Sequence, residues 1–88
     1  MGKFEIVFKR SVVRDLRQIP KKDVTRILKR IEALKLEPRP LGVEKLSGQD
    51  KYRVRQGVYR ILYEIENNKL IIVVVKIGHR RHVNRMGK

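Results

Sequence analysis

The sequence predicts an α+β fold with the element order βααβββ, in which a helical hairpin packs on one face of an antiparallel sheet. Two patterns support this class. Residues 23–35 carry apolar side chains at the i, i+3, i+4, i+7 spacing of an amphipathic helix. Residues 52–66 alternate on either side of Gly57, which is typical of a strand hairpin. With 88 residues, the chain is expected to form a single domain spanning residues 1–88.

The first half of the chain predicts one strand and two helices. Residues 4–8, FEIVF, alternate weakly and are expected to form the first strand. Ser11 is a candidate N-cap for a short helix that carries apolar residues up to Ile19. Pro20 is expected to close that helix and to open the next one, because proline is tolerated at a first helical position.

The second half predicts a loop followed by three strands. Prolines within LEPRPLG end the second helix and begin a loop that extends to about Gly48. Strands are expected at residues 52–56, 58–66 and 69–78. The last contains LIIVVV, which is apolar at every position and is therefore predicted to be central with both faces covered. Elsewhere the sheet face opposite the helices is expected to stay partly open.

Charge is the main indication of function. There are 23 Lys and Arg residues against 9 Asp and Glu, which gives a formal net charge of +14. Because such a field repels itself in the folded state, it favours a polyanionic partner, nucleic acid above all. No segment approaches the roughly 18 consecutive apolar residues of a membrane span, and there is no cysteine. We therefore expect a cytoplasmic protein without a membrane partner.

Basic residues gather in the predicted meander. Strand alternation places Arg53 and Arg55 on one face, and a tight turn would bring Arg60 beside them. Like charges across strands destabilise a sheet unless an anion lies between them, so this cluster predicts a phosphate site. The tail GHRRHVNR delivers more basic side chains to one sheet end. The residues expected to contact the nucleic acid are Lys45, Lys51, His79, Arg81 and Arg85.

Acidic residues are scarce near these arginines. No carboxylate pair lies among them, which disfavours a metal-dependent nuclease, and we expect neither a metal nor a cofactor. Guanidinium groups are poor bases, so another group must transfer protons. His79 and His82 are the titratable candidates, although histidines on a basic tail more often contact RNA. Of these two, His82 is placed with the catalytic residues.

With these motifs in view, the chain resembles the RelE branch of the RelE/ParE toxin superfamily. The resemblance rests on IPKKDVTRILKRIEAL, on KLSGQDKYRVRQGVYRILYEIE and on the apolar strand that ends in GHRR. It implies a toxin with a cognate antitoxin, which enters the A site of the 70S ribosome and cuts mRNA there, in contact with ribosomal RNA. The implied reaction is attack of an RNA 2′-hydroxyl on the adjacent phosphate, without a metal.

The resemblance also implies roles for particular residues. Arg53, Arg55, Arg60 and Arg80 match the basic positions of RelE-like nucleases. Relatives commonly end in GHRxxVY, whereas here Asn84 replaces the tyrosine, so the general acid or base is not assigned. Two alternatives therefore stay open: a non-catalytic RNA- or DNA-binding domain of the same fold, and a ParE-like inhibitor of DNA gyrase.

Overall fold

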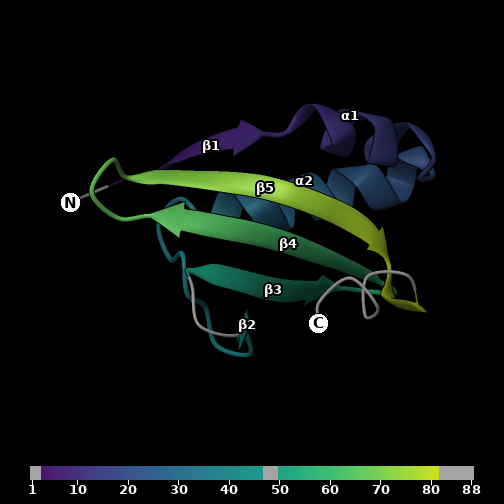
Figure 1. The fold of residues 1–88 in the computed structure, drawn as a ribbon. Helices are drawn as coiled ribbons and strands as arrows, with labels where there is room; N and C mark the ends of the chain where they lie inside the picture. The colour runs from purple at the N-terminus through teal and green to yellow at the C-terminus, as the bar shows by residue number, and fades with distance from the viewer. Residues whose placement is uncertain (1–2, 47–49, 82–88) are drawn as a thin grey trace.

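The computed structural model describes residues 3–46 and 50–81, which form two helices and a five-stranded sheet (Figure 1). The elements are β1 (Glu5–Phe8), α1 (Arg10–Arg17), α2 (Lys21–Ala33), β2 (Glu44–Leu46), β3 (Lys51–Gln56), β4 (Tyr59–Glu66) and β5 (Ile71–His79). The strand order is β1-β5-β4-β3-β2. The predicted α+β class is confirmed, and β2 is an additional short strand within the predicted loop.

The sheet is mixed. The antiparallel arrangement expected from the sequence holds from β2 to β5, whereas β1 pairs in parallel with β5. A parallel pair needs a long crossover connection, and here α1, α2 and three strands separate β1 from β5 in the chain. The middle strand is therefore β4 rather than β5, although β5 is an interior strand with neighbours on both sides.

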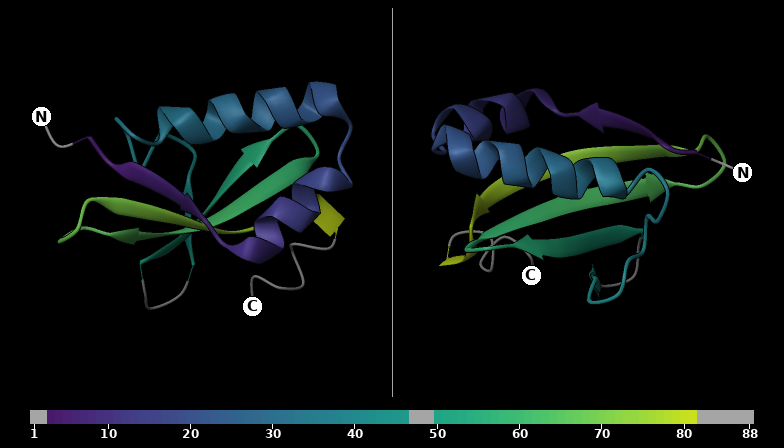
Figure 2. Two further views of the ribbon diagram at one scale, coloured as in Figure 1. Left: turned by 90° about the horizontal axis from the view of Figure 1, so that it is seen from above. Right: turned by 180° about the vertical axis from the view of Figure 1, so that it is seen from behind.

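Helix α2 lies across one face of the sheet, as the view from behind in Figure 2 shows. It buries Ile27 and Ile31 against the strands. Pro20 is the N-cap of this helix, and its carbonyl oxygen accepts hydrogen bonds from the backbone N–H groups of Asp23 and Val24. Proline is tolerated at this position, because a backbone N–H at the start of a helix has no acceptor inside the helix and its absence costs nothing there.

Helix α1 begins one residue before the expected cap. Its N-cap is Lys9, so the prediction that Ser11 caps the helix is wrong. The cause is the approach from β1: the Lys9 N–H donates to the Val74 carbonyl of β5, which holds Lys9 in extended backbone conformation. The helix then turns Val12 into the core.

The core lies between the sheet and the helices. Alternate residues of the strands point toward the helices and are buried: Tyr52, Val54, Ile61, Tyr63, Ile65, Ile72, Val74 and Ile77. The intervening residues lie on the opposite face, which we call the open face. Burial of so many aliphatic and aromatic side chains on one side fixes the register, because a one-residue slip would turn them all outward.

The edge of β5 beyond the end of β1 is covered by α1. The Asp15 carboxylate of α1 accepts a hydrogen bond from the Ile77 N–H at 3.2 Å and another from Lys76 Nζ at 3.1 Å. An unpaired strand edge is a site of unwanted pairing, and this carboxylate occupies it. Neither of the two helices in the described ranges is long and apolar enough to cross a membrane.

Candidate nucleic-acid interface

The β3–β4 hairpin brings arginines together on the open face. Its turn is tight because Gly57 adopts φ 61°, a left-handed conformation that favours glycine. The resulting register places Arg55 directly opposite Arg60 and Arg53 opposite Leu62. The expectation that Arg60 would lie near Arg53 or Arg55 is confirmed. We call Arg53, Arg55 and Arg60 the arginine cluster.

Arg60 is a half-buried member of the cluster. Its Nε atom is buried and has no hydrogen-bond partner among the described residues. On its other side it faces Gly78 of β5, which has no side chain. A buried donor without a partner costs about 1–3 kcal/mol, so an anion that reached this point would recover that energy.

Glu44 of β2 is a member of this site that the sequence interpretation missed. Its Oε1 accepts a hydrogen bond from Arg53 Nε at 3.0 Å. This hydrogen bond lowers the pKa of Glu44, and the positive charges of Arg53, Arg60 and Arg55 lower it further. Glu44 belongs to β2, a strand of only three residues within the predicted loop. A strand so short shows no alternation of apolar and polar residues from which it could be predicted.

Arg80 lies at the same end of the sheet. Its backbone N–H donates to the Val58 carbonyl at 2.8 Å, which ties the residue after β5 to the β3–β4 turn. Its side chain is exposed, and so is that of Arg81. The structure therefore brings Arg80 near the turn that joins Arg55 and Arg60, in agreement with the predicted convergence of the two basic segments.

His79 lies apart from the arginine cluster. It pairs with Tyr59 across β4 and β5, and paired residues share a face, so both belong to the side that faces the helices. The two rings meet edge to face with centroids 6.3 Å apart, and His79 Nδ1 accepts a hydrogen bond from the Arg81 N–H. His79 thus lies at the end of β5, on the side of the sheet that faces the helices.

The two predicted lysines also separate. Lys51 lies on the open face, at the opposite end of β3 from Arg55. Its Nζ is 3.9 Å from Glu64 Oε2. Lys45 is paired with Tyr52, a core residue, so it lies on the side opposite the arginine cluster. His82, Asn84 and Arg85 lie outside the described residues.

The tyrosines of the meander are engaged away from the open face. The Tyr63 hydroxyl donates to the Pro38 carbonyl at 2.6 Å, and the Tyr52 hydroxyl accepts from Arg39 Nε at 2.8 Å. Tyr59 donates to the Asp23 carboxylate at 3.4 Å. Burial, and after it the negative charge of Asp23, raises the pKa of Tyr59, which makes its phenol a poorer proton donor and disfavours the phenolate.

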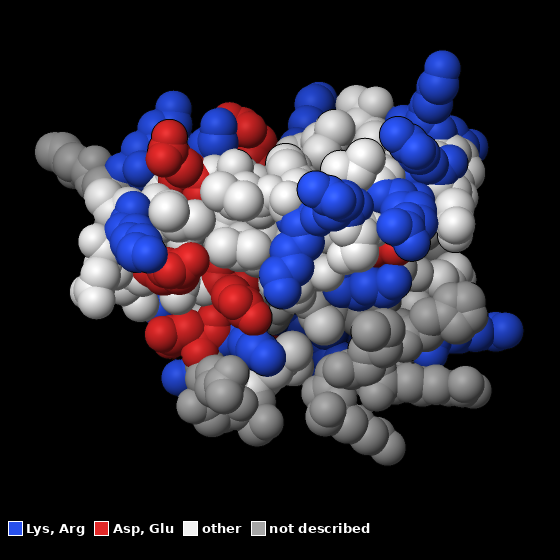
Figure 3. Space-filling model, turned by 45° about the horizontal axis from the view of Figure 1, so that its top comes forward, with Lys and Arg blue, Asp and Glu red and all other residues white. Residues whose placement is uncertain are grey.

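Charge is unevenly distributed over the surface. Figure 3 shows lysine and arginine side chains predominating toward the end where β5 finishes, and acidic side chains gathering toward the opposite end. Within residues 3–46 and 50–81, no three His, Asp or Glu side chains come together in a way that could hold a metal ion. The site is therefore built mainly from cationic hydrogen-bond donors, which suit phosphate oxygens.

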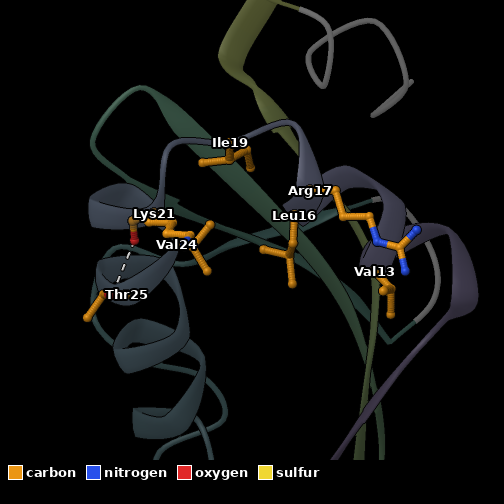
Figure 4. A pocket seen from close by; sticks show the side chains of 7 residues that line it. All are labelled: Val13, Leu16, Arg17, Ile19, Lys21, Val24 and Thr25. Atoms are coloured by element: carbon orange, nitrogen blue, oxygen red, sulfur yellow. Dashed lines mark hydrogen bonds between the residues drawn. The ribbon is translucent and has the colours of Figure 1, made fainter.

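A hollow of about 590 Å³ lies between the two helices (Figure 4). Apolar side chains line it, among them Leu16, Ile19, Val24 and the half-exposed Val13, with Arg17 and Lys21 also contributing. No carboxylate or histidine is among the described residues that line it, and the Thr25 hydroxyl there donates a hydrogen bond to the Lys21 carbonyl. The candidate site for chemistry is consequently the open face with its arginine cluster.

Comparison with known proteins agrees with this picture. The family model described as "ParE toxin of type II toxin-antitoxin system, parDE" matches residues 6–84. The chain belongs to the RelE/ParE toxin superfamily. It is 33% identical over 82 residues to the protein named "Putative toxin RelE1" of Methanocaldococcus jannaschii, covering 89% of this chain and 91% of that protein.

Solved RelE structures share the fold of this RelE/ParE toxin. The RelE–RelB complex of Pyrococcus horikoshii OT3 contains a chain that matches with a TM-score of 0.81 and 31% identity, over 91% of this chain and 97% of that one. A chain in the RelB–RelE complex of Methanococcus jannaschii matches with a TM-score of 0.72 and 26% identity, over 91% of this chain and 96% of that one. The isolated Escherichia coli RelE toxin, at 19% identity and a TM-score of 0.76, shares the fold alone, over 94% and 98%.

Proposed function

We propose that this RelE-like toxin is a metal-independent endoribonuclease that cuts mRNA in the A site of the ribosome. The observation that carries the proposal is the arginine cluster, because two arginines lie directly opposite each other and one buried Nε has no partner among the described residues. Such a cluster destabilises the sheet unless an anion binds. A phosphate flanked by ribose hydroxyls is the anion that makes the cluster chemically useful.

The proposed reaction is an in-line transfer. The 2′-hydroxyl of the substrate forms a bond to the adjacent phosphorus, and the bond from phosphorus to the 5′-oxygen breaks. The products are a 2′,3′-cyclic phosphate and a 5′-hydroxyl. Arg60 would neutralise the charge that builds on the phosphoryl oxygens, while Arg55, directly opposite it, and Arg53, farther along β3, would hold the RNA backbone.

Arg80 and the tail complete the proposed site. Arg80 would contact the phosphate from the end of β5, next to the β3–β4 turn. The arginines cannot accept a proton, because guanidinium is effectively always protonated. His82 remains the proposed proton-transfer residue. Lys51, Arg81 and Arg85 are proposed to contact RNA, whereas the positions of Lys45 and His79 on the other side favour contacts at the rim.

We also propose that a cognate antitoxin binds this toxin and blocks its basic surface. Two of the matched structures are complexes of RelE with RelB, at 31% and 26% identity to this chain. A protein partner that neutralises the arginine cluster would stop RNA from entering it. Both the ribosome and the antitoxin would be met in the cytoplasm.

The decisive experiment is cleavage of mRNA on programmed ribosomes whose A site is empty, with the product ends mapped. Discrete cuts in the A-site codon with cyclic-phosphate ends are expected. Antitoxin added at equal concentration should abolish them. Tight, salt-sensitive binding without any cut would instead identify the chain as a non-catalytic RNA-binding member of the family.

A second candidate function is inhibition of DNA gyrase. It is favoured by the match of residues 6–84 to the ParE family model. A supercoiling assay with purified gyrase distinguishes the two functions. If the protein is a nuclease, gyrase should supercoil DNA at the uninhibited rate in its presence, although the protein cuts mRNA on ribosomes.

A further inference from the structure

We propose that Glu44 is a positioning residue of the phosphate site: its carboxylate holds Arg53 in place and occupies the position of an RNA phosphate until RNA displaces it. The inference deepens the proposed nuclease function and rests on it, because it assumes that the arginine cluster receives a phosphate. It assigns a role to the one carboxylate that contacts the arginine cluster in the described part of the chain.

The register of β2 places this carboxylate in the site. Glu44 pairs with Arg53 across the antiparallel β2–β3 ladder, so both side chains lie on the open face. Glu44 Oε1 accepts from Arg53 Nε at 3.0 Å, a distance typical of a charge-assisted hydrogen bond. Arg55 and Arg60 are near enough for their charges to act on the same carboxylate. Glu44 thus supplies the negative charge that a phosphate would supply at Arg53, while Arg60 Nε keeps no hydrogen-bond partner among the described residues.

The two partners of this ion pair differ in freedom. The side chain of Arg53 is 16% exposed and that of Glu44 is 54% exposed. The guanidinium is therefore packed in position, whereas the carboxylate can move into solvent from the edge strand. A phosphate that carries more charge and more acceptor oxygens can replace it without rearranging Arg53. The exchange would favour a phosphate held by several arginines at once over weakly bound anions.

A general-base role fits these observations less well. A base accepts a proton more readily as its pKa rises, and the arginines lower the pKa of Glu44. The hydrogen bond to Arg53 also occupies one of the two carboxylate oxygens. The carboxylate is therefore expected to affect binding much more than the chemical step.

The test compares Glu44→Gln with the wild type and with Glu32→Gln, which makes the same charge change on α2, where Glu32 pairs with Lys35. The probe is a single-stranded RNA oligonucleotide with 2′-O-methyl groups, which cannot be cut by 2′-hydroxyl attack. Its binding to the full chain is followed by fluorescence anisotropy. Glu44→Gln is expected to bind about two- to fivefold more tightly than both references, the range of an exposed ion pair.

The conservative variant and the kinetics complete the test. Glu44→Asp should bind the oligonucleotide between the wild type and Glu44→Gln, because its shorter side chain reaches Arg53 poorly. On programmed ribosomes, Glu44→Gln should lower KM and leave kcat within about threefold of the wild type, as expected when binding of the ground state and of the transition state changes equally. Circular dichroism confirms that each variant is folded.

Several outcomes would overturn the inference. Binding by Glu44→Gln that equals or falls below that of Glu32→Gln would show that no anion is displaced. A loss of kcat by a hundredfold or more, with oligonucleotide binding unchanged, would make Glu44 a proton-transfer residue instead. Failure of the proposed function is recognised separately, because then no variant, the wild type included, cuts mRNA on the ribosome while the binding comparison still gives its result.

Discussion

At the scale of single residues, Arg60 combines a structural cost with a proposed chemical role. It lies opposite a like charge, Arg55, and its Nε is buried without a partner in the described structure. Arg60→Ala should therefore leave the free energy of unfolding unchanged or raise it by up to about 1 kcal/mol, since a like-charge pair is removed. Cleavage on programmed ribosomes should fall by about 10²–10³-fold, as when a donor to a developing oxyanion is removed.

Two controls make the Arg60 experiment specific. Arg60→Lys keeps the charge but not the planar fork, so it should recover only part of the activity. Lys29→Ala, on the exposed side of α2, should cut at the wild-type rate. Cleavage by Arg60→Ala at the wild-type rate would remove Arg60 from the mechanism.

Glu44 gives the stability of the protein a definite pH dependence. Its hydrogen bond to Arg53 lowers the pKa of its carboxyl below the ordinary 4.5. A lowered pKa stabilises the fold above the unfolded value, and this contribution is lost as the pH falls through the folded value. The wild type should exceed Glu44→Gln in free energy of unfolding by less than about 1 kcal/mol near neutral pH, because the pair is exposed.

Urea unfolding at a series of pH values measures this difference. It should be constant from about pH 8 to pH 6 and shrink as the pH falls below 4.5. A difference that persists unchanged to about pH 2.5 would show that the charge of Glu44 is not what stabilises the pair.

The resemblance of the sequence to RelE-like toxins predicts that Asn84 occupies the position of a tyrosine in those toxins. Residue 84 lies outside the described ranges. An amide cannot exchange a proton as a phenol can. Asn84→Tyr should therefore raise the single-turnover cleavage rate on ribosomes while leaving RNA binding unchanged. An unchanged rate would place proton transfer elsewhere, with His82→Ala as the next variant to compare.

At the scale of elements, Asp15 joins α1 to the edge of β5. Asp15→Ala would remove the acceptor of both the Ile77 N–H and Lys76 Nζ. The free energy of unfolding, measured in urea, should fall by about 1–3 kcal/mol, because a partly buried donor loses its partner. Asp15→Asn can still accept from the Ile77 N–H and should lose less.

Lys76→Met is the matched control for Asp15. It removes the ion pair but keeps the hydrogen bond from the Ile77 N–H, so its loss of stability should be smaller than that of Asp15→Ala. If Asp15→Ala unfolds at the same urea concentration as the wild type, α1 is held by its apolar contacts alone.

The elements differ in how well the sequence predicts them. Helix α2 and the β3–β4 hairpin follow from periodicity and from Gly57, because these patterns repeat over many residues. The opposition of Arg55 and Arg60 follows from the same turn. In contrast, β2 has three residues, and a strand so short has no readable alternation. Its absence from the prediction also hid Glu44, which enters the site only through pairing with Arg53.

Other differences arise from tertiary contacts that local patterns cannot contain. The parallel pairing of β1 with β5 joins residues 5–8 to residues 71–74, far along the chain. Lys9, and not Ser11, is the N-cap of α1, because the Lys9 N–H donates a hydrogen bond to the Val74 carbonyl. Strand alternation alone places Arg53 and Arg55 on one face. The position of Lys45 on the opposite face follows only from the pairing of β2 with β3.

At the scale of the whole molecule, the formal net charge of +14 is unevenly placed, with Lys and Arg predominating at the end of the sheet that carries the proposed site (Figure 3). Such a field attracts a polyanion and releases counterions when it binds. Ribosome binding should therefore weaken steeply as salt rises. If the arginine cluster and Arg80 contact three or four phosphates, the slope of log K against log salt should be about −2 to −3, given roughly −0.7 for each contact on a single strand.

Replacing one arginine tests whether these contacts produce the slope. Arg55→Ala should make the slope shallower by roughly 0.7, whereas Lys29→Ala on the exposed side of α2 should leave the slope unchanged. The measurement is equilibrium binding of labelled toxin to programmed ribosomes over a series of potassium chloride concentrations. A flat response in the wild type would mean that apolar protein contacts dominate recognition, and gyrase would then be the better target, since the ParE-like function needs a protein surface rather than a phosphate backbone.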